Sequence, residues 1–215
     1  QPSEFIKPGF AIFAAWMFAT GKLHGTFPGT KIAGLSFLLV ALLLLAQPDL
    51  GQTFVITVIW FTQWFLAGLP MIFVAGIVAL SLLGLVSAYF MLPHVASRVD
   101  RFIDPKSGDT YQVDKAMEAF TNGGLFGTGP GEGMVKTRLP DAHSDFIFAV
   151  VGEEFGLIAC LVLLLTFAFV VLRGFFRLMH ETDLFVVLAA AGLLVQFGIQ
   201  ALINMGSTVN LLPTK

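Results

Sequence analysis

The residues best suited to chemistry lie where a polar stretch runs into an apolar one, in the segment 136–156, KTRLPDAHSDFIFAVVGEEFG. Its polar part contains Lys136, Arg138, Asp141, His143 and Asp145. Two further acidic residues, Glu153 and Glu154, follow inside the apolar part. Charged side chains are costly in lipid and usually serve a function there. A charged cluster at the mouth of an apolar segment therefore indicates a working site, with Asp145 at its centre.

Asp145 has two interpretations. It lies at a predicted boundary between loop and helix, where Asp, like the neighbouring Ser144, is a favoured N-cap residue. Alternatively, a carboxylate at a low-dielectric boundary has a raised pKa and can accept a proton as a general base. His143 could hydrogen-bond to Asp145 or be an ordinary loop histidine. With Asp141 and Asp145 it also forms a small set of candidate metal ligands, which is a weak signal.

Glu153 and Glu154 lie too deep in the apolar segment to cap its start. Adjacent residues of a helix point about 100° apart, so at least one of the two carboxylates must face the interior of a bundle or a wet cavity. One interpretation is structural, in which a carboxylate braces a neighbouring helix through Arg or Lys. The other gives one of them a direct part in the chemistry, and the sequence leaves both open.

Basic residues on the same predicted side of the membrane are candidate ligands for an anion. They are Arg98, Arg101, Lys136, Arg138 and Lys215. Taken singly, each is best explained as a solvated charge. Together, beside a carboxylate and over a hydrophobic bundle, they suit an amphiphilic substrate with an anionic head group.

Composition restricts the class of protein. The chain has 215 residues, of which 56% are hydrophobic and 12% charged, whereas soluble domains are about 25% charged. These values predict an all-α, polytopic transmembrane helical bundle; the continuous apolar runs disfavour a transmembrane β-barrel. A net charge of −2 with no basic stretch argues against nucleic acid as a partner. Cys160 stands alone in an apolar run and is uninformative about redox compartment or metal.

Six apolar segments can be marked along the chain. Four are separate runs, at 5–20, 32–46, 146–172 and 184–205. The other two form one run, 53–92, which would be about 60 Å long as a single helix, twice the bilayer core. This run must therefore be a helical hairpin, broken near residues 67–70. The first two segments are short for a span and need a tilt or flanking residues such as Trp16 and Lys22 to complete them.

The short loops predict the orientation. Lys22 and Lys31 lie in one loop, and Arg173 and Arg177 lie in another that must be on the same side, which the positive-inside rule makes cytoplasmic. The loop 47–52, the long loop 93–145 and both ends of the chain would then face outward. Because the chain begins with Gln rather than Met and stops just after an apolar span, we expect it to be an internal piece of a longer protein.

The long loop 93–145 is the only extended polar region. Within it, Val113, Ala116, Met117 and Phe120 recur at helical spacing, which predicts an amphipathic helix over 111–121, ended by Asn122-Gly123-Gly124. The following glycine-rich stretch, 124–133, is either a flexible connector or a place where backbone amides approach a phosphate. It is not a Walker A loop, because its spacing is wrong and no Gly-Lys-Ser/Thr follows.

Several motifs, in this order, resemble the SEDS family (shape, elongation, division, sporulation). They are Gln1-Pro2-Ser3-Glu4 with Lys7, Gln47-Pro48-Asp49-Leu50-Gly51, Tyr111-Gln112, the glycine-rich stretch, Leu139 to Val150 (LPDAHSDFIFAV), Glu153-Glu154 and Asn210 to Lys215 (NLLPTK). Details at Arg101-Phe102 to Asp104-Pro105, Gly108 to Gln112 and Gly129 to Gly133 resemble the cell-division branch more than the elongation branch. Asp141 and Ser144 stand where the family commonly has Glu and Thr, which leaves the match at Asp145 undisturbed.

The resemblance implies a bundle of ten helices, of which this chain would hold about helices four to nine, as one incomplete domain over 1–215. It implies a peptidoglycan glycosyltransferase of the bacterial cytoplasmic (inner) membrane that polymerises lipid II during septal cell-wall synthesis. Asp145 matches the family's essential residue and would be the general base on the 4-hydroxyl of the acceptor. Lys215, with Arg98 or Arg101, would stabilise the undecaprenyl pyrophosphate that leaves, with Lys136 and Arg138 as further candidates.

A divalent cation could also stabilise the leaving group; no cofactor is certain from the sequence, and the metal question stays open. The roles of His143, Glu153 and Glu154 are left as supporting ones. The resemblance implies a class B penicillin-binding protein transpeptidase, other divisome membrane proteins and membrane lipid as partners, and no nucleic acid. Two alternatives remain: a lipid II flippase or transporter, with Glu153 and Glu154 along its pathway, and a scaffold for division proteins.

Overall fold

The computed structural model describes residues 2–47, 49–91, 93, 95–97, 100 and 111–212. Within these ranges the chain is helical, with no β-strand. The helices are α1 (Pro2–Leu23), α2 (Gly29–Ala46), α3 (Leu50–Leu66), α4 (Met71–Met91), α6 (Tyr111–Gly123), the short 3₁₀ helix η2 (Val135–Arg138), α7 (Ile147–Leu178) and α8 (Leu184–Thr208). The all-α prediction is confirmed for this part of the chain.

Each predicted apolar segment is a helix, and most helices are longer than their apolar runs. The first segment, predicted to be short, extends to the 22 residues of α1 because the flanking residues continue the helix. The run 53–92 is a helical hairpin, as its length required. It breaks at Gly68, whose φ of 95° no L-residue adopts readily, and at Pro70, which cannot continue a helix.

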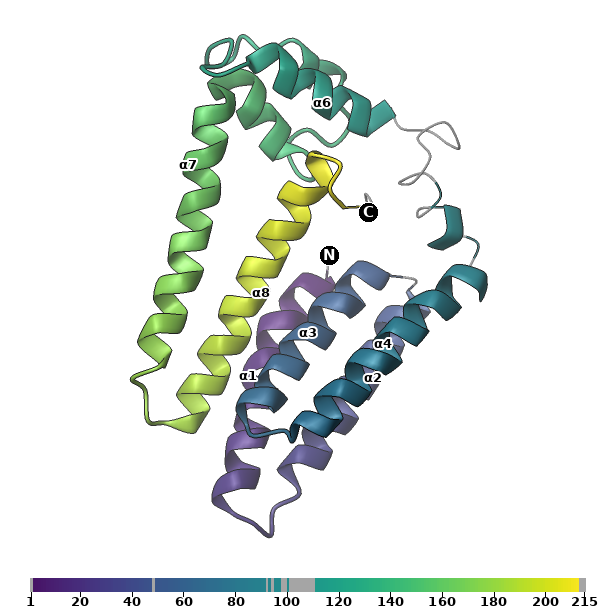
Figure 1. The fold of residues 1–215 in the computed structure, drawn as a ribbon, viewed down its shortest axis with the longest axis vertical. Coiled ribbons are helices and arrows are strands. Elements are labelled where there is room, and N and C mark those ends of the chain that lie inside the picture. Colours follow the sequence, from purple (N-terminus) through teal and green to yellow (C-terminus); the bar gives the residue numbers. More distant parts are fainter. Residues whose placement is uncertain are drawn as a thin grey trace. The chain divides into compact units, whose positions relative to one another are not determined.

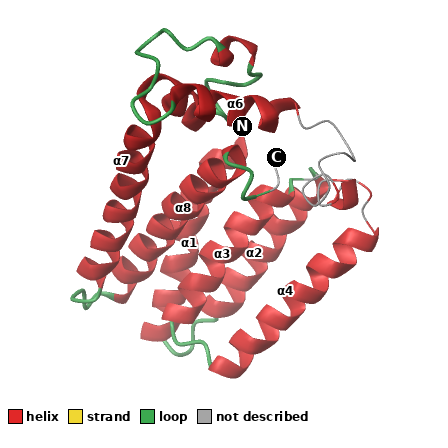
Figure 2. Ribbon diagram, turned by 45° about the horizontal axis from the view of Figure 1, so that its top comes forward, coloured by secondary structure: helices red, strands yellow, loops and turns green. Residues whose placement is uncertain are grey.

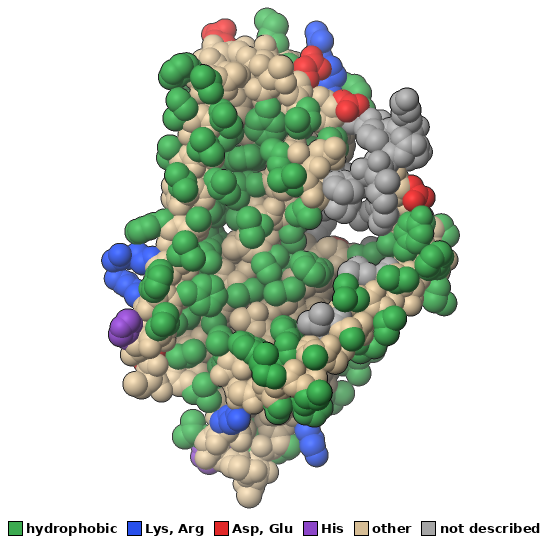
Figure 3. All heavy atoms as spheres, viewed as in Figure 1, with side chains coloured by type: hydrophobic (Ala, Val, Ile, Leu, Met, Phe, Trp, Pro, Cys, Tyr) green, Lys and Arg blue, Asp and Glu red, His purple; other side chains and the backbone are tan. Residues whose placement is uncertain are grey.

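Four of the described helices are long and apolar enough to cross a membrane: α2, α4, α7 and α8. Helix α3 is apolar but has only 17 residues. Helix α1 is long enough but carries Glu4, Lys7 and Lys22. On the face drawn in Figure 3, hydrophobic side chains line the helices and charged side chains gather near their ends. Large exposed apolar residues of α2, such as Leu35 and Leu42, are expected where lipid replaces water.

The chain forms two compact units, which we describe separately. The first contains Gln1–Ile77 and Ala168–Gln200, and the second contains Val78–Phe167 and Ala201–Lys215. In the first unit α1, α2 and α3 lie side by side (Figures 1 and 2) around a core that includes Phe18, Ile56 and Leu188. The prediction that residues 1–215 form a single domain is not tested by this division and stays a prediction.

A buried glutamine ties three helices of the first unit together. Gln63 of α3 is fully buried, and its Nε2 donates to the carbonyl oxygen of Ala11 in α1 at 2.7 Å and to that of Leu188 in α8 at 3.2 Å. Gly192 leaves room for this amide, because a Cβ there would lie 2.3 Å from Nε2. The turn before α3 is tight, as predicted: Asp49 is its N-cap and accepts from the amide of Gln52 at 3.0 Å.

The second unit contains α6, η2, the first part of α7 and the last turns of α8. Figure 1 shows α6 beside the N-terminal part of α7. Its main core joins small residues of α6 and α7 to the segment that follows η2; the buried members are Ala116, Ala119, Val135, Leu139, Ala142, Phe146 and Ala149. The predicted amphipathic helix is therefore present, as α6, and it ends at Gly123, within the predicted Asn122-Gly123-Gly124 stop. On its predicted apolar face, Ala116 is buried and Phe120 packs against the same core, whereas Met117 is exposed.

Candidate active site

Helix α7 is interrupted nine residues after its start, beside the acidic pair. Gly156 has φ 78° and ψ −178°, so the helix ladder is broken there. In an unbroken helix the amides of Leu157 and Ile158 would donate to the carbonyls of Glu153 and Glu154. These four backbone groups need other partners, because unpaired polar groups are costly inside a membrane protein.

The glycine-rich stretch supplies those partners by inserting its backbone into the break. Leu157 donates to the carbonyl of Gly124 at 2.9 Å and Ile158 to that of Leu125 at 3.3 Å. In the other direction, the amides of Thr128 and Gly129 donate to the carbonyls of Glu153 and Glu154 at 2.9 and 3.0 Å. Two hydrogen bonds within the helix are thus replaced by four hydrogen bonds between the loop and α7. An inserted backbone is a known cause of a sharp kink.

Glycine is required where the two backbones touch. A Cβ at Gly127 would lie 2.1 Å from the carbonyl oxygen of Glu154, and one at Gly123 would lie 2.0 Å from that of Gly152. Gly127 also has φ 83°, in the left-handed region that side chains disfavour. These glycines are therefore neither a flexible connector nor a phosphate site: they allow the loop backbone to approach the backbone of α7. The amides of Thr128 and Gly129 are already occupied and do not face a phosphate.

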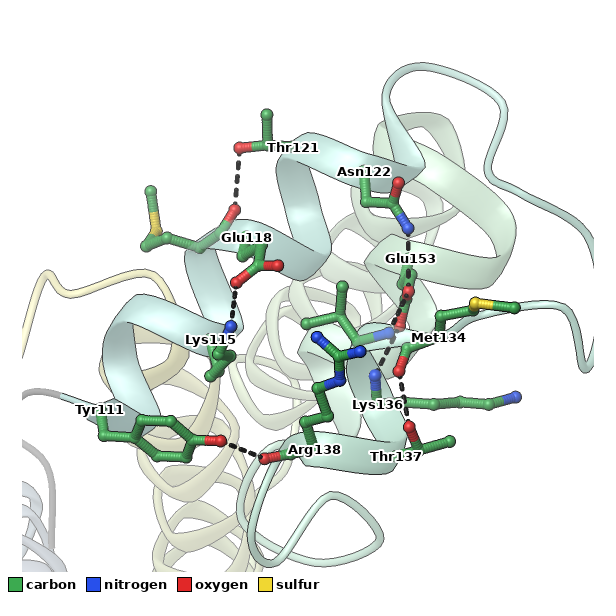
Figure 4. Close-up of polar contacts among 12 residues, drawn as sticks. Tyr111, Lys115, Glu118, Thr121, Asn122, Met134, Lys136, Thr137, Arg138 and Glu153 are labelled. Atoms are coloured by element: carbon green, nitrogen blue, oxygen red, sulfur yellow. Dashed lines mark hydrogen bonds and ion pairs between the residues drawn. The ribbon is translucent and has the colours of Figure 1, made fainter.

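Glu153 lies at the centre of this arrangement and is fully buried. Its Oε1 accepts from the amide of Val135 at 2.8 Å and from Asn122 Nδ2 at 3.0 Å, and its Oε2 accepts from the amide of Lys136 at 2.8 Å (Figure 4). Gly133 makes room for the carboxylate, since a Cβ there would be 2.8 Å from Oε2. The brace expected from Arg or Lys is instead made by two backbone amides and a side-chain amide.

Glu154 points elsewhere and forms an ion pair with Lys136. Both side chains are mostly buried, with 14% of Glu154 and 23% of Lys136 exposed. Lys136 Nζ also donates to the carbonyl of Gly131 at 3.1 Å. These contacts favour a structural role for Lys136, which the sequence had suggested as an anion ligand.

Asp145 lies in a tight turn just before α7, and its side chain is exposed. The turn is held by backbone bonds from Ser144 and Phe146 to the carbonyl of Asp141, at 3.1 and 3.3 Å. Asn204 of α8 donates to the backbone carbonyl of Asp145 at 3.3 Å. A carboxylate presented to solvent from a backbone fixed on several sides is suited to accept a proton from a bound substrate.

Two other predicted site residues near Asp145 in the sequence have exposed side chains. Arg138 and His143 are exposed, and Arg138 is held through its carbonyl, which accepts from the Tyr111 hydroxyl at 3.1 Å (Figure 4). In the described ranges, no group of three His, Cys, Asp or Glu residues is placed to hold a metal ion. Arg98, Arg101 and Lys215 lie outside the described residues.

The first unit contains a polar cluster built on Glu4 and Lys7, two residues of the first motif, to which the sequence assigned no role. Lys7 of α1 has only 1% of its side chain exposed, and its Nζ forms an ion pair with Glu4 Oε2 at 2.6 Å. Gln52 of α3 and Gln200 of α8 donate to Glu4 at 2.5 and 3.0 Å. The signal in the sequence was a Glu and a Lys three residues apart at the start of an apolar segment.

These contacts keep Glu4, which precedes the apolar run, in its charged form. Burial raises the pKa of Glu4, but the hydrogen bonds and the charge of Lys7 outweigh burial and lower the pKa to about 2. Lys7 Nζ has no aligned hydrogen bond among the described residues, so its contact with Glu4 is best described as an ion pair.

The sequence also gave no functional signal for two residues of the second unit, Asn122 and Asn204. Asn122 donates to the carboxylate of Glu153, and Asn204 donates to the backbone carbonyl of Asp145.

Comparison with known proteins gives consistent results along the whole chain. The model of the FtsW, RodA and SpoVE family, described as "Cell cycle protein", matches residues 1–215. The chain is 46% identical over 215 residues to a "Probable peptidoglycan glycosyltransferase FtsW" of Caulobacter vibrioides (strain NA1000 / CB15N), covering all of this chain and 55% of that protein. A protein with the same description from Polynucleobacter necessarius subsp. necessarius (strain STIR1) is 37% identical, and the match covers 100% of this chain and 53% of that protein.

A solved structure agrees in fold. Its title is "Structural coordination of polymerization and crosslinking by a peptidoglycan synthase complex". The match has a TM-score of 0.74 and 26% sequence identity, and it covers all of this chain and 61% of that one. The chain spans about half the length of the curated relatives it matches.

Proposed function

Because the chain belongs to the FtsW, RodA and SpoVE family of cell cycle proteins, we propose that it is part of a peptidoglycan glycosyltransferase that polymerises lipid II in septal cell-wall synthesis. The relatives named as FtsW glycosyltransferases, one of them 46% identical, support this reading over the elongation branch. The four described helices able to span a membrane support a multi-pass protein. We place it in the inner membrane, at the division septum.

In the proposed reaction Asp145 takes the proton from the 4-hydroxyl of the acceptor's terminal GlcNAc. That oxygen attacks C1 of the donor's MurNAc, and the bond from C1 to the pyrophosphate oxygen breaks. Undecaprenyl pyrophosphate leaves with the bonding electron pair. Lys215, with Arg98 or Arg101, would stabilise the negative charge on the leaving group, as positive charge fixed near a transition state does. Arg138, whose side chain is exposed, is a further candidate for the same task.

The observation that carries this proposal is the contrast in environment among the acidic residues of segment 136–156. Glu153 is saturated with hydrogen-bond donors and Glu154 is paired with Lys136. Asp145 presents an exposed side chain from a backbone held by Asn204 and by its own turn. Asp141 is exposed as well, and the match of Asp145 to the family's essential residue favours Asp145 over Asp141 as the base.

The transport alternative depended on Glu153, Glu154 and the outward charges lining a pathway. Glu153 is fully buried and Glu154 is paired with Lys136, which favours the enzyme over the transporter. We retain a class B penicillin-binding protein as the proposed partner. The related structure is titled as a complex that coordinates polymerization and crosslinking, which supports such a partnership.

The test is polymerisation of purified lipid II by the full-length protein together with its transpeptidase partner. Asp145→Ala should abolish glycan strand formation, while the variant still assembles with the partner. Polymerisation at the unsubstituted rate by Asp145→Ala would overturn the assignment of Asp145. A lipid II flipping assay in vesicles separates the alternatives, because flipping that Glu153→Gln and Glu154→Gln abolish would favour transport.

A further inference from the structure

The 3₁₀ helix η2 has no cap of its own. Its N-cap residue, Met134, makes no side-chain hydrogen bond to the helix, as a Met side chain has no good acceptor. The first amides of any helix lack an internal partner and must find one elsewhere. In η2 those amides belong to Val135 and Lys136, and both donate to the carboxylate of Glu153. Glu153, which is 17 and 18 residues away in the sequence, is thus a distant cap for η2.

This cap is specific to a carboxylate. Each of its two oxygens accepts from a different backbone amide, and the oxygen that faces Val135 also accepts from Asn122. Such charge-assisted bonds are stronger than those between neutral groups. A glutamine of the same shape would offer one oxygen and turn an N–H group toward a backbone N–H. A buried donor would then be left unsatisfied, which is unfavourable.

The capped helix leads directly to the turn that presents Asp145. Val135 packs in the same core as Leu139, Ala142 and Phe146, the buried residues around that turn. At the other end of η2, the amide of Leu139 donates to the carbonyl of Lys136 at 3.3 Å. The position of η2 therefore determines where the buried residues of the turn begin, and so where Asp145 stands.

We propose that Glu153 is a positioning residue for the reaction: by capping η2 from α7, it holds the segment 135–146 in the arrangement that presents Asp145 to substrate. The inference rests on the proposed function, since it takes Asp145 as the base. Glu153 itself does not touch substrate. It acts on the chemistry through the backbone of η2 and the buried residues that follow.

The experiment compares Glu153→Gln with Glu154→Gln in the full-length protein bound to its transpeptidase partner. Lipid II polymerisation gives kcat and KM, and hydrogen exchange is measured over residues 134–138. Glu153→Gln should lower kcat about tenfold to a hundredfold, as small misplacements of a catalytic group do. KM for lipid II should change little, and the amides of η2 should exchange faster. Glu154→Gln removes an equal charge next door but no cap, so its kcat should stay within about twofold and its exchange should match the unsubstituted protein.

Unchanged kcat in Glu153→Gln would overturn the inference, as would an equal loss in Glu154→Gln, which would indicate charge rather than capping. Glu153→Asp decides the matter if Glu153→Gln does not fold. Its shorter carboxylate cannot reach both amides, so an intermediate fall in kcat is expected and an unsubstituted rate would contradict it. Asp145→Ala is run alongside: activity in that variant would sink the proposed function, whereas loss there with full activity in Glu153→Gln would sink this inference alone.

Discussion

Two carboxylates of the second unit, Glu153 and Asp145, lie eight residues apart in the sequence and have opposite environments. Glu153 is fully buried and accepts hydrogen bonds from Asn122 and from two backbone amides. Asp145 has an exposed side chain, and the bonds around it fix its backbone. A charged cluster at the mouth of a membrane segment therefore need not act as one site. Glu153 holds the backbone amides of η2, whereas Asp145 is exposed, as the role proposed for it as a base requires.

The contrast between Glu153 and Asp145 predicts that substitutions in the glycine-rich stretch destabilise the second unit, whereas substitutions of Asp145 do not. The largest effect is expected for Gly127→Ala. The added Cβ would clash with the carbonyl of Glu154 and would sit at φ 83°, so we expect a loss of about 3 kcal/mol or more in the free energy of unfolding. Denaturant titration of the purified protein in detergent measures it.

Gly131→Ala is the matched control for Gly127→Ala. Gly131 has φ 84°, but a Cβ there would meet nothing within 4 Å. Only the backbone strain applies, so a loss of about 1 kcal/mol is expected. Equal losses in the two variants would show that the contact with α7 contributes nothing, and the docking of the loop on the helix break would then be wrong.

An intermediate effect is expected for Lys136→Met, which removes the partner of Glu154. The pair is mostly but not fully buried, and the expected loss is about 1 kcal/mol in the free energy of unfolding. High salt should narrow the gap between the variant and the unsubstituted protein, because it screens the attraction that the variant lacks. A loss of lipid II binding beyond this change in stability would return Lys136 to the set of anion ligands.

The smallest effect on stability is expected for Asp145→Asn. The side chain is exposed, and substitutions at such positions usually change the free energy of unfolding by less than about 0.5 kcal/mol. The same titration measures it, with the polymerisation assay run on the same sample. A large fall in stability would mean that Asp145 acts chiefly as a helix cap, and the contrast with Glu153 would disappear.

Much of the fold could be predicted from local patterns. Apolar runs indicated the helices of all six segments, and Gly68 with Pro70 indicated the break between α3 and α4. The spacing of apolar residues indicated α6 and its end at Gly123. These features depend on residues close together in the chain, whose preferences for helix, turn or apolar surroundings are visible in any window of the sequence.

The contacts around the acidic pair of α7 could not be predicted in this way. The amides of Val135 and Lys136 meet Glu153 across 18 and 17 residues, and Asn122 meets it across 31. The glycines could be recognised as permissive, but not which backbone they would touch. The same reason applies to the ion pair of Glu4 and Lys7, because its further partners, Gln52 and Gln200, belong to two other helices.

Composition and residue order are enough to predict apolar helices able to span a membrane, with a charged cluster at the start of one of them, because hydrophobic length and the cost of charge in lipid can be read along the chain. Which charges of that cluster organise the backbone follows only from the tertiary structure. A helix broken at Gly156 needs donors and acceptors from elsewhere, and the chain supplies them from a loop 25 to 33 residues earlier. That pairing is fixed by geometry in three dimensions, and it separates Glu153 from Asp145.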